Sequence, residues 1–316
     1  MEKFDYIIVG AGTAGSLLAN RLSNDKNKNI LLVEAGGWDN NFWTKIPIGY
    51  YRLINNPKIT RHFFTEPEEG TAGRSIDWPR GRIIGGSSSV NGLIYIRGQK
   101  EDFDKWESLG AKGWGYNDVL PYFKKIENFD GKDSQYRGKF GEIKVSNLRK
   151  EHPFCNAWMN SAMQLGYDYN DDFNGETTLG IGKYDLNIGK RWRSSSSAAF
   201  LHPVKKRENL KIYTNTFVEK ITFENRKTTG IIVFKNGKRS NIKCNKELIL
   251  CAGAIQSPQI LQLSGIGPEK LLKKFNIPVI VNSKYVGKNL QDHFQSRLIV
   301  EMRDNISLNN DVRRPL

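Results

Sequence analysis

The sequence predicts an α/β fold built on a parallel sheet, with additional antiparallel strands. Three observations lead to this prediction. The chain opens with a buried strand, a glycine-rich turn, a helix and a second buried strand. A strand, a glycine and a helix recur around residue 250. Between these two units, consecutive segments alternate apolar and polar residues, which is typical of antiparallel strands.

The opening unit spans residues 4–37. Residues 4–10 (FDYIIVG) form a short apolar run bounded by glycine, as expected of a strand buried on both faces of a parallel sheet. Residues 11–25 place leucines at helical spacing, and residues 29–37 (NILLVEAGG) read as the second buried strand. Because strand–helix–strand crossovers are right-handed, the two strands are expected to lie parallel in one sheet.

The remaining elements follow in chain order. Aromatic residues and prolines between residues 38 and 78 predict long connections, and residues 93–110 and 114–129 contain predicted helices. Glycines and polar turns between residues 130 and 197 predict an inserted or second-domain segment. Residues 210–225 and 230–244 predict antiparallel strands, and residues 246–267 predict a buried strand, a glycine and a helix.

Composition and net charge limit the classes of protein to which this sequence can belong. The 316 residues are 38% hydrophobic and 11% aromatic, as in a globular protein of about two domains. The net charge is +15, but the lysines are scattered and no nucleic-acid-binding motif accompanies them, so we expect no nucleic-acid partner. Three cysteines without paired spacing predict neither a disulfide framework nor a metal site.

Targeting signals are not evident in the sequence. No apolar run reaches the ~20 residues that a transmembrane helix needs. The N-terminus lacks the charge pattern and cleavage site of a secretory signal. We therefore expect a cytoplasmic location, which leaves room for peripheral association with a membrane.

A glycine motif follows the first predicted strand. In Gly10-Ala-Gly12-Thr-Ala-Gly15, the first glycine suits a tight turn, the second allows close approach of a pyrophosphate, and the third allows the helix to pack on the strand. The pyrophosphate would lie at the helix N-terminus. Glu34 ends the next strand and can accept hydrogen bonds from an adenosine ribose. Together these features predict a dinucleotide site.

Two distant segments favour FAD over a nicotinamide cofactor. Residues 81–92 (GRIIGGSSSVNG) are small and rich in hydroxyls, and residues 248–253 end a buried strand in glycine. A cofactor that touches three separated segments is extended and enclosed, which suits FAD. A nicotinamide-dependent reductase that uses the first motif alone remains the alternative.

The sequence resembles the glucose-methanol-choline (GMC) flavin oxidoreductases. The resemblance rests on residues 5–23, 78–98, 251–267 and 286–295, which look like the successive signatures of that family. Within the family it is most similar to choline dehydrogenases and related alcohol dehydrogenases. It implies a Rossmann-like FAD-binding region over residues 1–296, with residues 130–197 as an irregular insert from the substrate domain, and the start of an incomplete C-terminal substrate domain at 297–316.

The resemblance also implies which residues bind the cofactor. Val90 stands where some members carry a histidine that binds FAD covalently, so we expect non-covalent FAD. The positions expected to contact it are Gly10, Gly12, Thr13, Ala14, Gly15, Glu34, Ala35, Gly81, Arg82, Ile84, Gly86, Ser88, Asn91, Gly92, Leu93, Ile94, Val218, Ala252, Gly253, Asp292 and His293.

The reaction implied by the resemblance is oxidation of a primary alcohol to an aldehyde by hydride transfer to flavin N5. The partners would be a small alcohol, choline or another, and an external electron acceptor, oxygen or a quinone-type molecule. The sequence leaves these choices and the oligomeric state open.

The family's catalytic base is a histidine that would lie beyond Leu316, so no catalytic residue is assigned, and His293 is the histidine expected nearest the flavin. We therefore expect a truncated gene, a partial sequence or one part of a split protein. The alternative function is a catalytically inactive FAD-binding fragment.

Overall fold

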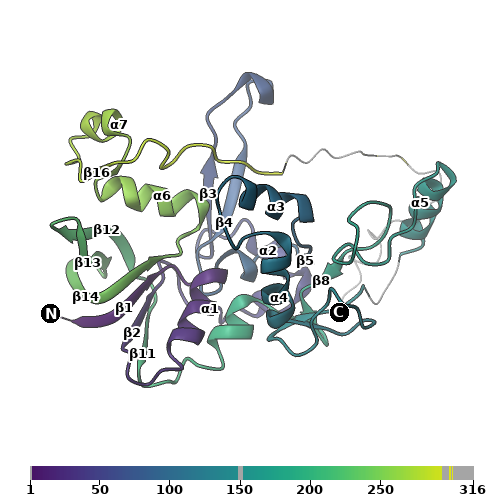
Figure 1. The fold of residues 1–316 in the computed structure, drawn as a ribbon, viewed down its shortest axis with the longest axis horizontal. Helices are drawn as coiled ribbons and strands as arrows, with labels where there is room; N and C mark the ends of the chain where they lie inside the picture. The colour runs from purple at the N-terminus through teal and green to yellow at the C-terminus, as the bar shows by residue number, and fades with distance from the viewer. Residues whose placement is uncertain (1, 149–151, 294–298, 300, 302–316) are drawn as a thin grey trace.

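A six-stranded sheet forms the centre of the fold (Figure 1). The computed structural model describes residues 2–148, 152–293, 299 and 301. The strands, in their order across the sheet, are β11 (Leu210–Tyr213), β2 (Ile30–Val33), β1 (Lys3–Val9), β14 (Lys238–Leu250), β13 (Lys227–Lys235) and β12 (Phe217–Glu224).

The long strand β14 joins the parallel and antiparallel parts of this sheet. Its first half pairs antiparallel with β13, where Ile231 lies opposite Ile242. Its second half pairs parallel with β1, where Val9 lies beside Leu250. The prediction of an α/β fold with a parallel sheet and additional antiparallel strands is confirmed.

One strand direction was predicted wrongly. The segment containing β11 was expected to be antiparallel, but β11 pairs parallel with β2, with Leu210 beside Ile30. The alternation of apolar and polar residues indicates a half-buried strand, and it carries no information on the direction of the partner. β11 is a short edge strand, which explains its alternation.

The core lies on both faces of the sheet. Side chains alternate along β1 and β2, so Ile7 and Leu31 face one layer while Ile8 and Leu32 face the other, and all four are fully buried. Helix α6 (Gly253–Leu263) packs on the first layer through Ile260, and helix α1 (Thr13–Leu22) covers the second. Each such buried Ile or Leu contributes about 1.5–3 kcal/mol.

The other elements surround this sheet. The helices are α2 (Tyr50–Leu53), α3 (Lys100–Ser108), α4 (Tyr116–Ile126), α5 (Pro153–Gln164) and α7 (Glu269–Lys274), and short helical turns lie at η1 (Phe42–Thr44), η2 (Pro47–Gly49), η3 (Glu69–Thr71), η4 (Gly86–Ser89) and η5 (Ser197–Leu201). Paired short strands are β3 (Thr60–Phe64) with β4 (Asp77–Gly81), β5 (Ile94–Tyr95) with β8 (Asp185–Leu186), β6 (Glu127–Phe129) with β7 (Ile143–Val145), β9 (Ile188–Gly189) with β10 (Trp192–Arg193), and β15 (Ile266–Gly267) with β16 (Val281–Asn282).

Two predicted helices and one predicted connection can be compared with these elements. The helices expected within residues 93–110 and 114–129 are confirmed as α3 and α4. Residues 38–78 were expected to be connections, but β3 and β4 form an antiparallel hairpin that rises from the body of the molecule (Figure 1). Among the helices of the described residues, none has the length and apolar character to cross a bilayer.

The region between α4 and β8 is held by a buried ionic cluster. The carboxylate of Glu127, fully buried, accepts hydrogen bonds from Arg97 Nη2 at 2.7 Å and Arg137 Nε at 2.9 Å. Arg137 Nη1 also donates to Asp172 at 2.6 Å and to Asp185 at 2.8 Å. Burial alone would lower the pKa of Arg137, but the hydrogen bonds that it donates to its carboxylate partners raise it. Arg137 therefore stays protonated, and the cluster ties four segments together.

The domain boundaries expected from the sequence stay predictions. Residues 130–197 contain β7, α5 and the short strands β8, β9 and β10, and the ionic cluster connects them to residues 97 and 127. The segment 297–316 lies outside the described residues except for residues 299 and 301.

Replacing Glu127 with glutamine should destabilise the fold strongly. The change leaves Arg97 and Arg137 buried without their shared carboxylate, and removal of one partner of a buried ion pair costs about 3–5 kcal/mol. The matched control is Glu219→Gln, which breaks an exposed pair with Arg239 and should cost less than about 1 kcal/mol. Urea unfolding measures both values, and equal losses would contradict a structural role for the cluster.

Candidate functional site

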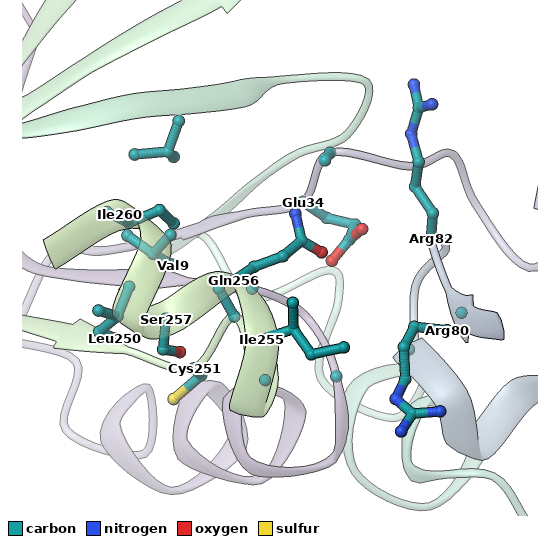
Figure 2. Close-up of a pocket in the computed structure, with 18 of the residues that line it drawn as sticks. Val9, Glu34, Arg80, Arg82, Leu250, Cys251, Ile255, Gln256, Ser257 and Ile260 are labelled. Atoms are coloured by element: carbon teal, nitrogen blue, oxygen red, sulfur yellow. The ribbon is translucent and has the colours of Figure 1, made fainter. Parts of the chain in front are cut away.

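A pocket of about 570 Å³ lies at the carboxyl ends of β1, β2 and β14, the edge of an α/β sheet where ligands usually bind. Figure 2 shows α6 on one side of this pocket and the chain carrying Arg80 and Arg82 on the other. The residues that line it come from five separated parts of the chain and from the hairpin β3–β4: 9–10, 12–14, 33–35, 63, 80–82, 86–87, 216–218, 250–257 and 260.

The three glycines of the first turn differ in the space around them. Gly10 has φ +99°, and a Cβ there would overlap the carbonyl of Cys251. A Cβ on Gly15 would overlap the carbonyl of Gly10. By contrast, a Cβ on Gly12 would meet only Gly86 Cα, at 4.0 Å. Gly10 and Gly15 are therefore required by the protein itself, whereas Gly12 leaves space on the pocket side.

Two helices begin at this pocket. Helix α1 begins after Gly12 and helix α6 after Ala252, and neither start carries a side-chain cap. Thr13, Gly253 and Ala254 line the pocket, so the first turns of both helices face it. The first amides of a helix lack intrahelical partners and its dipole is positive there, which favours an anion. Arg80 and Arg82 add positive charge from the opposite wall.

Glu34 is fixed at the end of β2. Its carboxylate is buried and accepts one hydrogen bond from the amide of Ala11 and one from the amide of Gly36, each at 2.9 Å. Burial raises the pKa of Glu34. In Figure 2 the side chain of Gln256 points toward this carboxylate. The free lone pairs of Glu34 can accept hydroxyl hydrogens of a ribose in the pocket.

The small-residue stretch packs against the first glycine turn. Gly86 has φ +55°, and a Cβ there would lie 2.8 Å from Gly12 Cα. The amide of Gly85 donates to the carbonyl of Ala11 at 2.7 Å. A Cβ on Gly81 would overlap the carbonyl of Gly86. A ligand was the expected cause of this lack of bulk, and the structure adds a second cause, which is contact between two protein loops.

More than half of the predicted cofactor-binding residues come together at this pocket. Those lining it are Gly10, Gly12, Thr13, Ala14, Glu34, Ala35, Gly81, Arg82, Gly86, Val218, Ala252 and Gly253.

The other predicted positions lie outside the pocket wall, and their contact with a cofactor stays a prediction. Gly15 and Ile84 are buried in the protein, and Leu93 is buried with φ +69°. Gly92 and Ile94 are exposed. Ser88 bonds to the hydroxyl of Ser196, and Asn91 to Arg193. Asp292 lies 3.5 Å from Arg80 and accepts the amide hydrogen of exposed His293.

Several pocket residues were not predicted. They are Val9, Val33, Phe63, Arg80, Ser87, Thr216, Phe217, Leu250, Cys251, Ala254, Ile255, Gln256, Ser257 and Ile260. The residues at the start of α6 could have been predicted from the sequence, because the strand, glycine and helix expected around residue 250 repeat the first motif. The first helical turn after Gly253 could therefore have been predicted to line the pocket. No sequence pattern around Phe63 predicts its place at the pocket, because it reaches the pocket only through the pairing of β3 with β4.

The chain matches a known family over most of its length. Residues 4–295 match the family model described as GMC oxidoreductase. The sequence is 40% identical over 303 residues to mitochondrial choline dehydrogenase of Mus musculus, covering 93% of this chain and 50% of that protein. It is 41% identical over 301 residues to an alcohol dehydrogenase (acceptor) of Pseudomonas putida, covering 94% of this chain and 54% of that protein.

A solved structure has the same fold. An FAD-dependent oxidoreductase from Chaetomium thermophilum superimposes with a TM-score of 0.82 at 31% identity, covering 88% of this chain and 50% of that one. The chain spans about half the length of the curated relatives that it matches.

The glycines of the first turn should differ in their effect on stability. Gly10→Ala combines a positive φ with overlap of backbone atoms and should lower the free energy of unfolding by at least about 2 kcal/mol. Gly12→Ala adds a Cβ in ordinary contact, at φ −72°, and should change it by less than about 1 kcal/mol. Denaturant unfolding of the ligand-free chain measures both. Equal losses would contradict the open space at Gly12.

Proposed function

The chain belongs to the GMC oxidoreductase family, and from this premise we propose that it is the FAD-binding part of an enzyme that oxidises a primary alcohol to an aldehyde. Choline is the first alcohol to test, because choline dehydrogenases are among the relatives with about 40% identity. The expected regions are an FAD-binding region over residues 1–296, with residues 130–197 as an insert, and a substrate domain that begins at 297.

One observation carries this proposal: a single pocket joins the first glycine turn to residues 80–87, 216–218 and 250–260. An extended dinucleotide can reach all of these segments at once. The pocket also matches the chemistry of FAD, with uncapped helix starts for a diphosphate and the acceptor Glu34 for a ribose. The residues present therefore fit the cofactor.

Each part of the pocket would hold a different part of FAD. The first amides of α1, beside Gly12, would hold the diphosphate, with Arg82 neutralising charge. Glu34 would accept hydrogen bonds from the adenosine ribose. The adenine would lie against an apolar wall whose members are Val33, Val218, Leu250 and Ile260. The flavin would extend along the turn η4 toward Ser88 and Asn91.

Binding is proposed to be non-covalent. Val90, at the position of the covalent histidine in some members, is buried and has no nucleophile. When bound, FAD supplies the hydride acceptor for oxidation of the alcohol, and an external acceptor reoxidises it.

The proton of the alcohol needs a base that this pocket does not supply. All four histidines of the chain lie in the described residues, and none lines the pocket. Of the titratable groups that do, Glu34 is held by two backbone amides, and burial raises the pKa of the Cys251 thiol. General base catalysis requires a group within hydrogen-bond reach of the hydroxyl. We propose that this group lies beyond Leu316.

The purified chain should bind FAD reversibly. Gly12→Ala should weaken FAD binding at least tenfold, because the new Cβ enters the space proposed for the diphosphate. A tenfold change in the dissociation constant corresponds to about 1.4 kcal/mol. Titration with FAD, followed by flavin fluorescence, measures both dissociation constants. The matched control is Gly37→Ala, where a Cβ makes an ordinary contact outside the pocket wall and binding should not change. Acid precipitation should release all the FAD. A chain that binds NADH and not FAD would overturn the proposal.

The FAD-loaded chain should not oxidise choline with an artificial electron acceptor, because the pocket lacks a base for the hydroxyl proton. Anaerobic mixing with choline, with flavin absorbance as the readout, tests this. Bleaching of the flavin at a rate that rises with choline concentration would contradict the placement of the base beyond Leu316.

A further inference from the structure

Arg193 is a buried arginine that hydrogen-bonds to the end of the small-residue stretch. It is the last residue of β10 and is 4% exposed. Its Nη1 donates to the side-chain oxygen of Asn91 at 2.7 Å, to the Asn91 carbonyl at 2.8 Å and to the Ser88 carbonyl at 3.3 Å. Within the described residues, its Nε and Nη2 are buried without a hydrogen-bond partner.

The charge of Arg193 has no carboxylate partner among the described residues, unlike that of the other deeply buried arginines. Arg97 and Arg137 share Glu127 at hydrogen-bond distance. Burial lowers the pKa of Arg193 to about 10, with no opposing effect of an acid. The side chain therefore stays protonated at neutral pH. The described part of the chain thus buries a positive charge with no carboxylate beside it, which is unfavourable on its own.

The three hydrogen bonds do not by themselves require this charge. A neutral amide side chain can donate to backbone carbonyls, as Asn209 does to three of them in this chain. Holding the turn with a guanidinium that has no carboxylate partner among the described residues thus costs more free energy than holding it with a neutral donor. The position of Arg193 indicates a second role, because η4, which contains Ser88, supplies Gly86 and Ser87 to the pocket wall and is followed closely by Asn91.

We infer that Arg193 is a positioning residue that holds Ser88 and Asn91 against the flavin end of the cofactor and raises the reduction potential of the bound flavin. The inference rests on the proposed binding of FAD. Hydride transfer adds two electrons and one proton to the flavin, so the flavin gains one negative charge. A buried positive charge behind the turn stabilises that charge more than it stabilises the oxidised flavin.

Two variants separate the charge from the hydrogen bonds. Arg193→Gln removes the charge but still provides a hydrogen-bond donor, its side-chain amide. Arg193→Lys keeps the charge and changes the geometry of the donor. The control is Arg207→Gln, in which the native Nη1 donates to the Asn20 carbonyl and the Ser23 hydroxyl, both at 2.8 Å and away from the pocket. The midpoint potential of bound FAD is measured by equilibration with a reference dye, and the dissociation constant of FAD by fluorescence.

In Arg193→Gln the potential should fall by at least about 30 mV, the equivalent of a tenfold change for a two-electron couple. It should change by less than half as much in Arg193→Lys, and not at all in Arg207→Gln. FAD binding should weaken in both Arg193 variants, because Ser88 and Asn91 lose part of their support.

An unchanged potential in Arg193→Gln would overturn the electrostatic role, and an unchanged dissociation constant would overturn the positioning role. Sulfite provides a test that needs no variant. It adds to flavin N5 and leaves the same negative charge on the ring, so the wild-type chain should form the colourless adduct. Absence of that adduct would overturn the electrostatic role even where Arg193→Gln does not fold. Failure of the wild-type chain to bind FAD would instead overturn the proposed function.

Discussion

The contact between two glycine-rich loops is the constraint on which the site depends. A Cβ on Gly86 would come within 2.8 Å of Gly12 Cα, so the second loop can lie on the first only because Gly86 has no side chain. The hydrogen bond from the Gly85 amide to the Ala11 carbonyl holds them together. This contact makes the wall of the pocket continuous from the first strand to η4. A side chain on Gly86 would push the two loops apart and interrupt this wall between the part proposed for the diphosphate and the part proposed for the flavin.

Strand β14 is the second feature on which the site depends. It is paired with β13 along its first half and with β1 along its second, so it carries the antiparallel strands to the same edge as the parallel ones. Val218 on β12 thereby lies at the pocket that also contains the ends of β1 and β2. Since β14 leads directly into α6, the same strand places a second uncapped helix start opposite the first. Segments more than 200 residues apart in the sequence thus meet at one edge of the sheet.

Features encoded within one short segment could be predicted from the sequence. The opening strand, turn and helix were predicted because the apolar run and the glycine spacing are local. The direction of β11 and the hairpin β3–β4 could not be, since both depend on partners distant in the chain. Arg80 and Phe63 were missed at the site for the same reason, because pairing within the hairpin places them there. Charged residues such as Glu127 carry no sequence signal of burial, and their role emerges only when several segments bring them together.

The deeply buried arginines show how the fold uses charge in two different ways. Arg97 and Arg137 each meet a carboxylate, so their burial cost is offset, and the cluster joins β6, β8 and the connections that carry its other members. Arg193 has carbonyl and amide oxygens as partners, which accept hydrogen bonds but leave its charge in place. If only rigidity at Asn91 were needed, a carboxylate beside Arg193 or a neutral donor in its place would provide it at a lower cost in free energy. The absence of a carboxylate among its described contacts agrees with the role proposed for Arg193. A fixed anion beside Arg193 would cancel the positive charge that is proposed to stabilise the reduced flavin.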